Sequence, residues 1–169
     1  MGQVLLHPHP TAPSALIDRV SVRFEREGDR LWLRYVVDGN VDDILWPHPA
    51  TPGRADELWR HTCFEAFVTT PDGYLEYNLS PSGRWASYRF DGYREGMRNA
   101  PEVVEISGMD GGCDMAALEA HVPLPPGPCR IGLTAVIEAR DGAISYWALA
   151  HPSDNPDFHN SDSFVLDLP

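Results

Sequence analysis

The sequence predicts an all-β protein, an antiparallel sandwich or barrel of about ten strands with little helix. Three observations lead to this prediction. Apolar and polar residues alternate with a period of two through much of the chain, as expected of half-buried strands. The sixteen prolines and fourteen glycines fall largely between the alternating segments, where they mark turns and connections. No segment carries a sustained apolar stripe with the period of a helix.

The first two strands are predicted from residues 17–26 and 31–37, because Gly28–Asp29 provides a turn between two alternating segments. Two later strands are joined by a turn that contains Pro71 and Gly73. The further predicted strands are Val41–Trp46, Thr62–Thr70, Tyr74–Leu79, Arg84–Phe90, Glu102–Ser107, Met115–Val122, Ile131–Ala139, Ile144–Leu149 and Ser163–Leu168.

The rest of the chain divides into connections and a lead. Residues 55–60 and 93–99 are each expected to form a helical turn or two, since neither has a longer apolar period. Residues 1–14 are interpreted as a proline-rich lead, and residues 15–169 as a single domain, in line with a total length of 169 residues.

Composition restricts the function classes. The formal net charge is −12, and all thirteen basic side chains are arginine. The lack of lysine excludes Schiff-base chemistry and a Walker-type phosphate loop. Nucleic acids and anionic membranes need clustered positive charge, so we expect neither as a partner. The acidic balance favours a neutral, hydroxyl-rich small molecule, and no pattern identifies a protein partner.

Cysteine usage and the N-terminus predict a cytoplasmic protein. Cys63, Cys113 and Cys129 are odd in number, widely spaced and without a Cys-x-x-Cys pair, which fits reduced thiols. The first residues lack the basic segment of a secretory signal. No apolar run approaches the roughly 18 residues that a membrane-spanning helix needs.

Polar side chains that could bind a ligand are concentrated in the middle of the chain. Glu65 lies on one predicted strand, and Glu76 and Asn78 share a face of the next. Trp85 and Arg89 share a face of the strand after that. If these strands are neighbours, one sheet face combines carboxylates, an amide, an arginine and an aromatic ring, which suits a sugar. The alternative is an ordinary solvated sheet face, where Glu–Arg pairs are common.

Loop residues would complete this site, with Trp59, His61 and His151 at its rim. The pair Glu65 and Glu76 also fits a glycosidase, in which one acid protonates the leaving oxygen and the other attacks or activates water. Carboxylates beside an arginine have lowered pKa values, which suits binding more than acid catalysis. We therefore expect no catalytic residues.

A metal site is a further hypothesis for the segment that begins at His151. Asp154, Asp157 and His159 would supply ligands for Ca²⁺ or a transition metal if this loop folds on itself. The alternative is that the Asp and Asn side chains form turns by bonding their own backbone.

Three segments resemble the DOMON-like and family 9 carbohydrate-binding-module superfamily, and in particular its bacterial single-domain branch. The first two are Thr62-Cys-Phe-Glu-Ala-Phe-Val and Tyr74-Leu-Glu-Tyr-Asn-Leu-Ser-Pro-Ser-Gly-Arg-Trp-Ala-Ser-Tyr-Arg-Phe. The third is 146–164, which looks like the C-terminal signature of that branch. Thr62 stands where related modules often have Asp, a departure that bears on an inherited calcium or sugar contact.

The resemblance implies an immunoglobulin-like antiparallel β-sandwich that binds a sugar or, as in the DOMON cytochromes, a haem. Met97, Met109, Met115 and the histidines are then the candidate haem ligands, because the chain has no lysine. We expect non-catalytic binding of a small saccharide and no cofactor. A haem-binding electron-transfer domain is the alternative, and a glycoside-acting enzyme is the third hypothesis.

Overall fold

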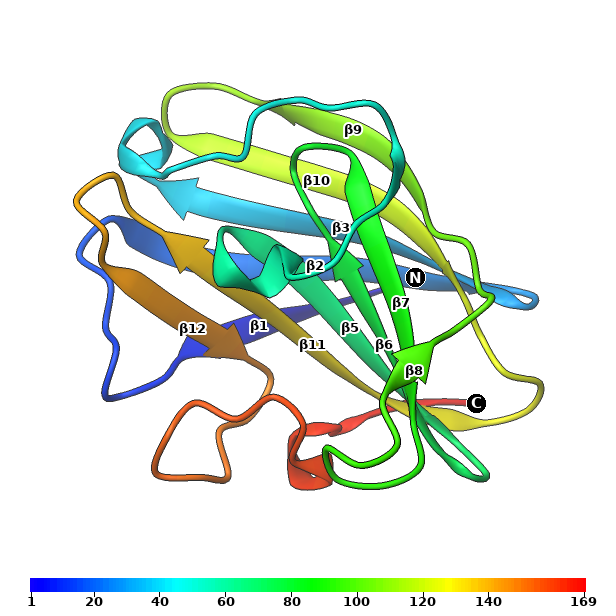
Figure 1. The fold of residues 1–169 in the computed structure, drawn as a ribbon. Helices are drawn as coiled ribbons and strands as arrows, with labels where there is room; N and C mark the ends of the chain where they lie inside the picture. The colour runs from blue at the N-terminus through cyan, green and yellow to red at the C-terminus, as the bar shows by residue number, and fades with distance from the viewer.

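The computed structural model describes residues 1–169 and contains thirteen strands and three short 3-10 helices (Figure 1). The strands are β1 (Gly2–Pro8), β2 (Ile17–Glu27), β3 (Arg30–Gly39), β4 (Gly53–Arg54), β5 (Cys63–Thr70), β6 (Gly73–Leu79), β7 (Arg84–Phe90), β8 (Arg98–Asn99), β9 (Glu105–Gly111), β10 (Met115–Pro123), β11 (Cys129–Glu138), β12 (Ile144–Ala148) and β13 (Leu166–Leu168). The helices are η1 (Val41–Asp43), η2 (Leu58–Arg60) and η3 (Ser161–Ser163).

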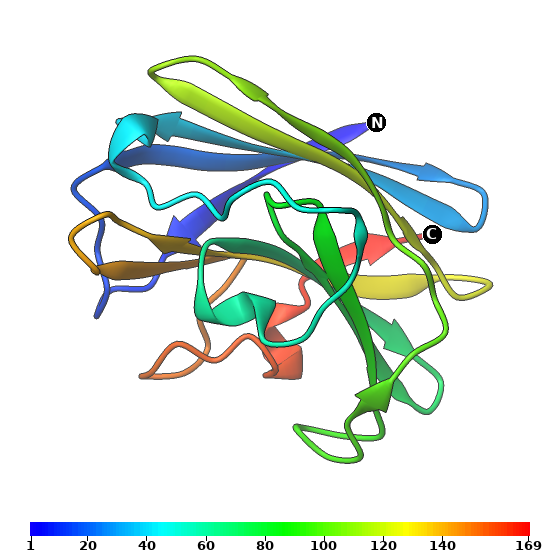
Figure 2. The same cartoon turned by 45° about the horizontal axis from the view of Figure 1, so that its top comes forward.

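The strands form two layers that lie face to face (Figure 2). The first sheet has the order β1-β2-β3-β10-β9, and the second has the order β4-β7-β6-β5-β11-β12, with β13 beside β11 and β8 beside β7. Strand β1 belongs to both sheets, because its first part pairs with β2 while His7 and Pro8 pair with β12. All neighbouring strands are antiparallel except β4 and β7. The predicted all-β sandwich with little helix is confirmed.

The main core fills the space between the two sheets. It contains thirty buried apolar residues, which come from alternate positions of strands in both layers. A polar contact crosses this core, because the Tyr35 hydroxyl on β3 donates a hydrogen bond of 2.6 Å to the Glu65 backbone carbonyl on β5. Tyr35 thus fixes the two sheets relative to each other at the strand that carries Glu65.

A second apolar cluster covers the opposite face of the second sheet. Nine buried residues form it, among them Phe67, Tyr74, Phe90, Phe158 and Phe164. The last two come from the connection between β12 and β13, which Figure 2 shows in orange and red on the side of the second sheet that faces away from the first. The second sheet is therefore buried on both faces, and this explains why six consecutive residues at the start of β5 are buried.

Close packing of the β12–β13 connection depends on a glycine of β11. A Cβ atom at Gly132 would lie 2.6 Å from the Phe164 ring, too close for any side chain. Phe164 instead stacks on Phe67 with ring centroids 5.5 Å apart. This contact holds the connection against the sheet.

Several elements differ from the sequence-based expectation. Residues 1–14 are not a separate lead, since residues 2–8 form β1. Residues 41–46, expected as a strand, form η1 and one isolated bridge at Ile44. Residues 55–60 form the single 3-10 turn η2, and residues 93–99 form no helix. No helix of the structure is long and apolar enough to cross a membrane.

The first prediction concerns the bond between the layers. Tyr35→Phe should lower the free energy of unfolding by about 1–2 kcal/mol, because it removes a buried hydrogen bond and leaves the Glu65 carbonyl oxygen without this donor. Urea unfolding measures the change. Tyr93→Phe is the control, because the Tyr93 hydroxyl bonds Asp157 at an exposed site and should matter by less than about 0.5 kcal/mol. Equal losses in the two variants would contradict the cross-sheet role of Tyr35.

Candidate functional site

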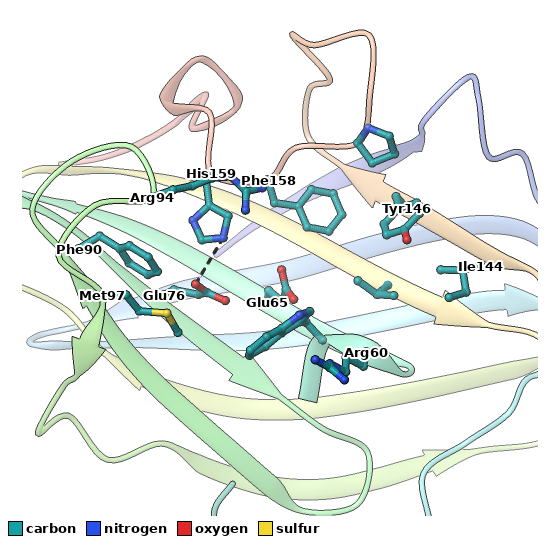
Figure 3. Close-up of a pocket in the computed structure, with 13 residues that line it drawn as sticks. Arg60, Glu65, Glu76, Phe90, Arg94, Met97, Ile144, Tyr146, Phe158 and His159 are labelled. Carbon is teal, nitrogen blue, oxygen red and sulfur yellow. Dashed lines mark ion pairs between the residues drawn. The ribbon is translucent and has the colours of Figure 1, made fainter. Parts of the chain in front are cut away.

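A cavity of about 590 Å³ opens on the outer face of the second sheet, against the second apolar cluster. Strands β5, β6, β7, β11 and β12 contribute to its lining, together with η2, the loop after β7 and the β12–β13 connection. Figure 3 shows the carboxyl groups of Glu65 and Glu76 both directed into it. The lining residues are Trp59, Arg60, Glu65, Glu76, Phe90, Arg94, Met97, Val136, Ile144, Tyr146, Pro156, Phe158 and His159.

Glu65 and Glu76 lie on neighbouring strands at the floor of the cavity. In the ladder between β5 and β6, Glu65 is opposite Asn78 and Glu76 is opposite Phe67, so the two glutamates are diagonal neighbours on one face. Diagonal Cα atoms in such a pair are about 7–8 Å apart, within reach of long side chains. Both glutamates are almost fully buried, with 2% and 4% of their surface exposed.

Burial sets the charge of this pair. Burial and the nearby Glu76 raise the pKa of Glu65 well above its usual range, although the Thr134 hydroxyl donates to its carboxylate at 3.1 Å and opposes the shift. Burial also raises the pKa of Glu76 to about 7, against the opposing effects of Asn78 and Arg94. Burial and the proximity of the two acids therefore both favour protonated forms of the pair.

Asn78, which was predicted as a site residue, lies opposite Glu65 in the ladder but does not line the cavity. Its side chain is completely buried and shares a sheet face with Glu76, yet neither its carboxamide oxygen nor its nitrogen has a hydrogen-bond partner of good geometry. Buried amides are almost always hydrogen-bonded, because an unmade bond costs about 1–3 kcal/mol. The one polar effect of Asn78 is on the neighbouring Glu76, whose pKa the Asn78 amide lowers.

His159 is held above the glutamates by a chain of hydrogen bonds. The Tyr74 hydroxyl accepts from the Arg94 backbone N–H at 3.3 Å and shares a hydrogen bond of 2.8 Å with Nδ1 of His159. Nε2 of His159 lies 3.7 Å from Oε2 of Glu76 (Figure 3). Burial lowers the pKa of His159 to about 4, so the contact with Glu76 is that of a neutral imidazole at pH 7.

The two arginines at the cavity are already paired. Arg94 lies 2.9 Å from the Asp157 carboxylate, and Arg60 lies 2.9 Å from Glu57. Arg94 and Glu57 both adopt a left-handed backbone conformation with positive φ, which is uncommon for residues other than glycine. Neither arginine forms an ion pair with the glutamates of the floor.

Trp85 and Arg89, predicted to share a face with the glutamates, lie on the opposite face of the second sheet. The ladder between β6 and β7 places them opposite Leu79 and Leu75, which are core residues, and not opposite Asn78 and Glu76. Trp85 packs against the main core, and Arg89 pairs with Glu102 at 2.7 Å.

Tyr88 occupies the position next to Glu76 instead. It lies on the outer face of the second sheet within the second apolar cluster, and its hydroxyl donates a 2.5 Å hydrogen bond to Asp56.

Of the three predicted rim residues, Trp59 lines the cavity and the two histidines do not. His61 contacts the Glu138 carboxylate at 2.7 Å through Nδ1. His151 contacts the His7 carbonyl at 2.7 Å and packs edge-on against His9, so it joins the β12–β13 connection to the end of β1.

Two of the predicted metal ligands, Asp157 and His159, each contact a different side chain of the protein. Asp157 pairs with Arg94, and His159 bonds Tyr74, as described above. No group of three or more His, Cys, Asp and Glu side chains has an arrangement that could hold a metal ion. Among the candidate haem ligands, Met97 and His159 line the same cavity, whereas Met109 and Met115 belong to strands of the first sheet.

Most residues of the cavity wall were not predicted from the sequence. Phe90, Val136, Ile144, Tyr146 and Phe158 all line it. Phe90, Val136, Ile144 and Tyr146 lie on strands that the periodicity identified, but the second buried face of the sheet was not expected. Phe158 lies in a loop, and its apolar side chain among polar neighbours was the available signal that this loop packs onto the sheet.

Neither a scan against protein-family models nor a search of the curated proteins finds a match for this chain. The fold and the site define an all-β sandwich with an aromatic and acidic cavity on its outer face. What that cavity does is inferred below from its own residues.

The second prediction concerns pH. The pKa of Glu76 is raised above its unfolded value, so its contribution to stability is complete below about pH 4.5 and is lost as pH rises through about 7. Glu76→Gln should therefore become more stable relative to the parent, by about 2 kcal/mol, between pH 5 and pH 8. Urea unfolding at both pH values measures this difference.

The control for this experiment is the exposed Glu57→Gln, which should keep the parent's dependence on pH. His159, whose pKa is lowered, acts with the opposite sign, since its contribution is lost as pH falls below about 6.5 toward 4. A difference between Glu76→Gln and the parent that stays constant from pH 5 to pH 8 would show that the floor carboxyl is not held protonated.

Proposed function

We propose that the protein binds a small polyhydroxylated ligand, a saccharide, in the cavity on the outer face of the second sheet, and that it acts as a binding module. The observation that carries the proposal is the pair Glu65 and Glu76, two almost fully buried carboxyl groups that line the cavity among aromatic side chains. A protonated carboxyl group can donate to one hydroxyl and accept from another, which is the pattern that adjacent sugar hydroxyls present.

The two glutamates form the polar floor of the cavity. A protonated carboxyl both donates and accepts, so Glu65 and Glu76 with their raised pKa values match hydroxyl groups better than two carboxylates would. Because both lie in a site with little water, each hydrogen bond to a ligand is stronger than at an open surface. The floor therefore offers two side chains of mixed donor and acceptor character.

The walls provide flat apolar surface. Trp59, Phe90, Tyr146 and Phe158 line the cavity above the floor, and aromatic rings of this kind pack against the C–H faces of sugar rings. A volume of about 590 Å³ lies within the range of roughly 300–1,000 Å³ that is typical of small-molecule sites. Aromatic walls and a polar floor together support a saccharide over a purely apolar ligand.

A second candidate function is glycoside hydrolysis, which the diagonal pair Glu65 and Glu76 favours. Diagonal Cα atoms about 7–8 Å apart suit the carboxyl separation of about 5–9.5 Å that paired-acid glycosidases use. In that mechanism Glu65, whose pKa burial raises well above its usual range, would protonate the leaving oxygen. Release of nitrophenol from nitrophenyl glycosides tests it.

Haem binding is favoured by one observation, because Met97 and His159 are residue types that ligate haem iron and both line the cavity. His159 presents Nε2 toward Glu76, with Nδ1 bonded to Tyr74. A protein that takes up haem should show a Soret band after loading, and a colourless product would remove this candidate.

The third prediction tests saccharide binding. Isothermal titration with a panel of mono- and disaccharides should detect a ligand, and Trp59 fluorescence should change on binding. Tyr146→Ala should weaken the affinity at least tenfold, because stacked rings contribute about 1.5 kcal/mol or more including their buried area.

Arg89→Ala is the matched control, since Arg89 lies on the opposite face of the same sheet and should leave the affinity unchanged. If no saccharide of the panel binds, or if Tyr146→Ala and Arg89→Ala lose affinity equally, binding in this cavity is contradicted.

A further inference from the structure

We propose that the saccharide carries a free amino group, and that its ammonium binds between the carboxyl groups of Glu65 and Glu76. This inference rests on the proposed function and names the ligand class within it, an amino sugar. It is argued from the charge balance of the floor, the chemistry of the walls and the charge of the whole molecule.

The floor has two acids and no cation. Arg94 and Arg60 are the basic side chains of the cavity, and each is engaged by an acid of its own at 2.9 Å. His159 is neutral at pH 7, because burial lowers its pKa to about 4. A buried acid pair without a counter-charge is costly to ionise. A ligand ammonium would supply one positive charge and let one glutamate ionise beside it.

Of the charged groups that face the pair, Arg94 alone favours ionisation, since it lowers the pKa of Glu76, and its charge is shared with Asp157. The groups that face the pair from each neighbouring element are Cys63 on β5, Tyr74 on β6, Tyr88 on β7, Thr134 on β11, Arg94 in the loop after β7, and Asp157 and His159 in the β12–β13 connection. Burial raises the pKa values of Cys63, Tyr74 and Tyr88, so these groups stay neutral. Asp157 is matched by Arg94.

Hydrogen-bond capacity fits as well. An ammonium has three donors and no acceptor, and the floor offers the carboxyl oxygens of Glu65 and Glu76, which are diagonal neighbours on one sheet face. A group with several donors therefore matches two adjacent carboxyl groups better than a single hydroxyl does.

The walls and the overall charge favour a cation too. Trp59, Phe90, Tyr146 and Phe158 line the cavity, and aromatic rings attract ammonium groups at close range. The net charge of −12 raises the local concentration of cations near the protein and not that of neutral sugars. The aromatic walls and the net negative charge therefore both favour a positively charged ligand, as Glu65 and Glu76 do.

Binding of an ammonium has a measurable consequence for protons. Protonated forms of the pair are favoured in the free protein, and the ammonium takes the place of one proton's positive charge. We therefore expect release of roughly one proton for each amino sugar bound at pH 6. Titrations in two buffers of different ionisation enthalpy measure this number, and a neutral sugar should release none.

The experiment compares D-glucosamine with D-glucose and N-acetyl-D-glucosamine, which have the same ring but no ammonium, by isothermal titration at pH 6. Glucosamine should bind at least tenfold more tightly than either neutral sugar and release a proton. Glu76→Gln should abolish the proton release and most of the preference for glucosamine. Glu119→Gln, a change on the first sheet, is the control and should retain both.

The outcomes separate the two proposals. Equal affinity for glucosamine and the neutral sugars without proton release would overturn the ammonium inference and leave saccharide binding in place. Cyclohexylamine, an amine without sugar hydroxyls, is titrated as a fourth probe. If it binds tightly while no sugar binds, the ammonium site is retained and the saccharide proposal is overturned. Failure of all four probes to bind would overturn both.

Discussion

Placing two glutamates side by side on a buried sheet face is the constraint from which the rest of the site follows. Ionising both would put two like charges into a region with little water, so the neutral form of at least one is favoured. The arginines at the cavity relieve this cost only in part, because Asp157 and Glu57 engage them. His159 is kept neutral as well. The cavity is thus acidic in composition but favours protonated carboxyl groups, and its chemistry depends on what enters it.

The burial that creates this constraint comes from the β12–β13 connection. Without it, the outer face of the second sheet would be an ordinary solvated face, with Glu65 and Glu76 in water. Phe158 and Phe164 cover that face, and Gly132 makes the close approach of Phe164 sterically permissible. A loop distant in sequence from both glutamates therefore determines how readily they ionise.

Sequence periodicity predicted the fold class and the central polar face, and it failed where two faces of one strand are buried alike. Glu65, Glu76 and Asn78 were placed together because polar side chains stand at alternate positions among apolar ones. On β7 the polar residues Trp85, Ser87 and Arg89 alternate just as regularly, but they point to the first sheet or its edge, while Tyr88 points to the cavity. Alternation defines two faces without saying which one meets the neighbouring strand's polar face. Periodicity does not predict the position of the wall residue Phe158, because that position depends on how the β12–β13 connection folds back onto the sheet.

The shared strand β1 has a consequence for how the chain folds during synthesis. Residues 2–8 leave the ribosome before the other strands of this sandwich, yet His7 and Pro8 pair with Ala148 and Trp147 of β12, about 140 residues further along. Contacts this distant in sequence form late, because a long loop must close before they stabilise anything. The N-terminal strand can dock on β2 early, but the junction between the layers waits for almost the whole chain. Until then its free end is an unpaired strand edge, the kind of surface through which nascent chains associate.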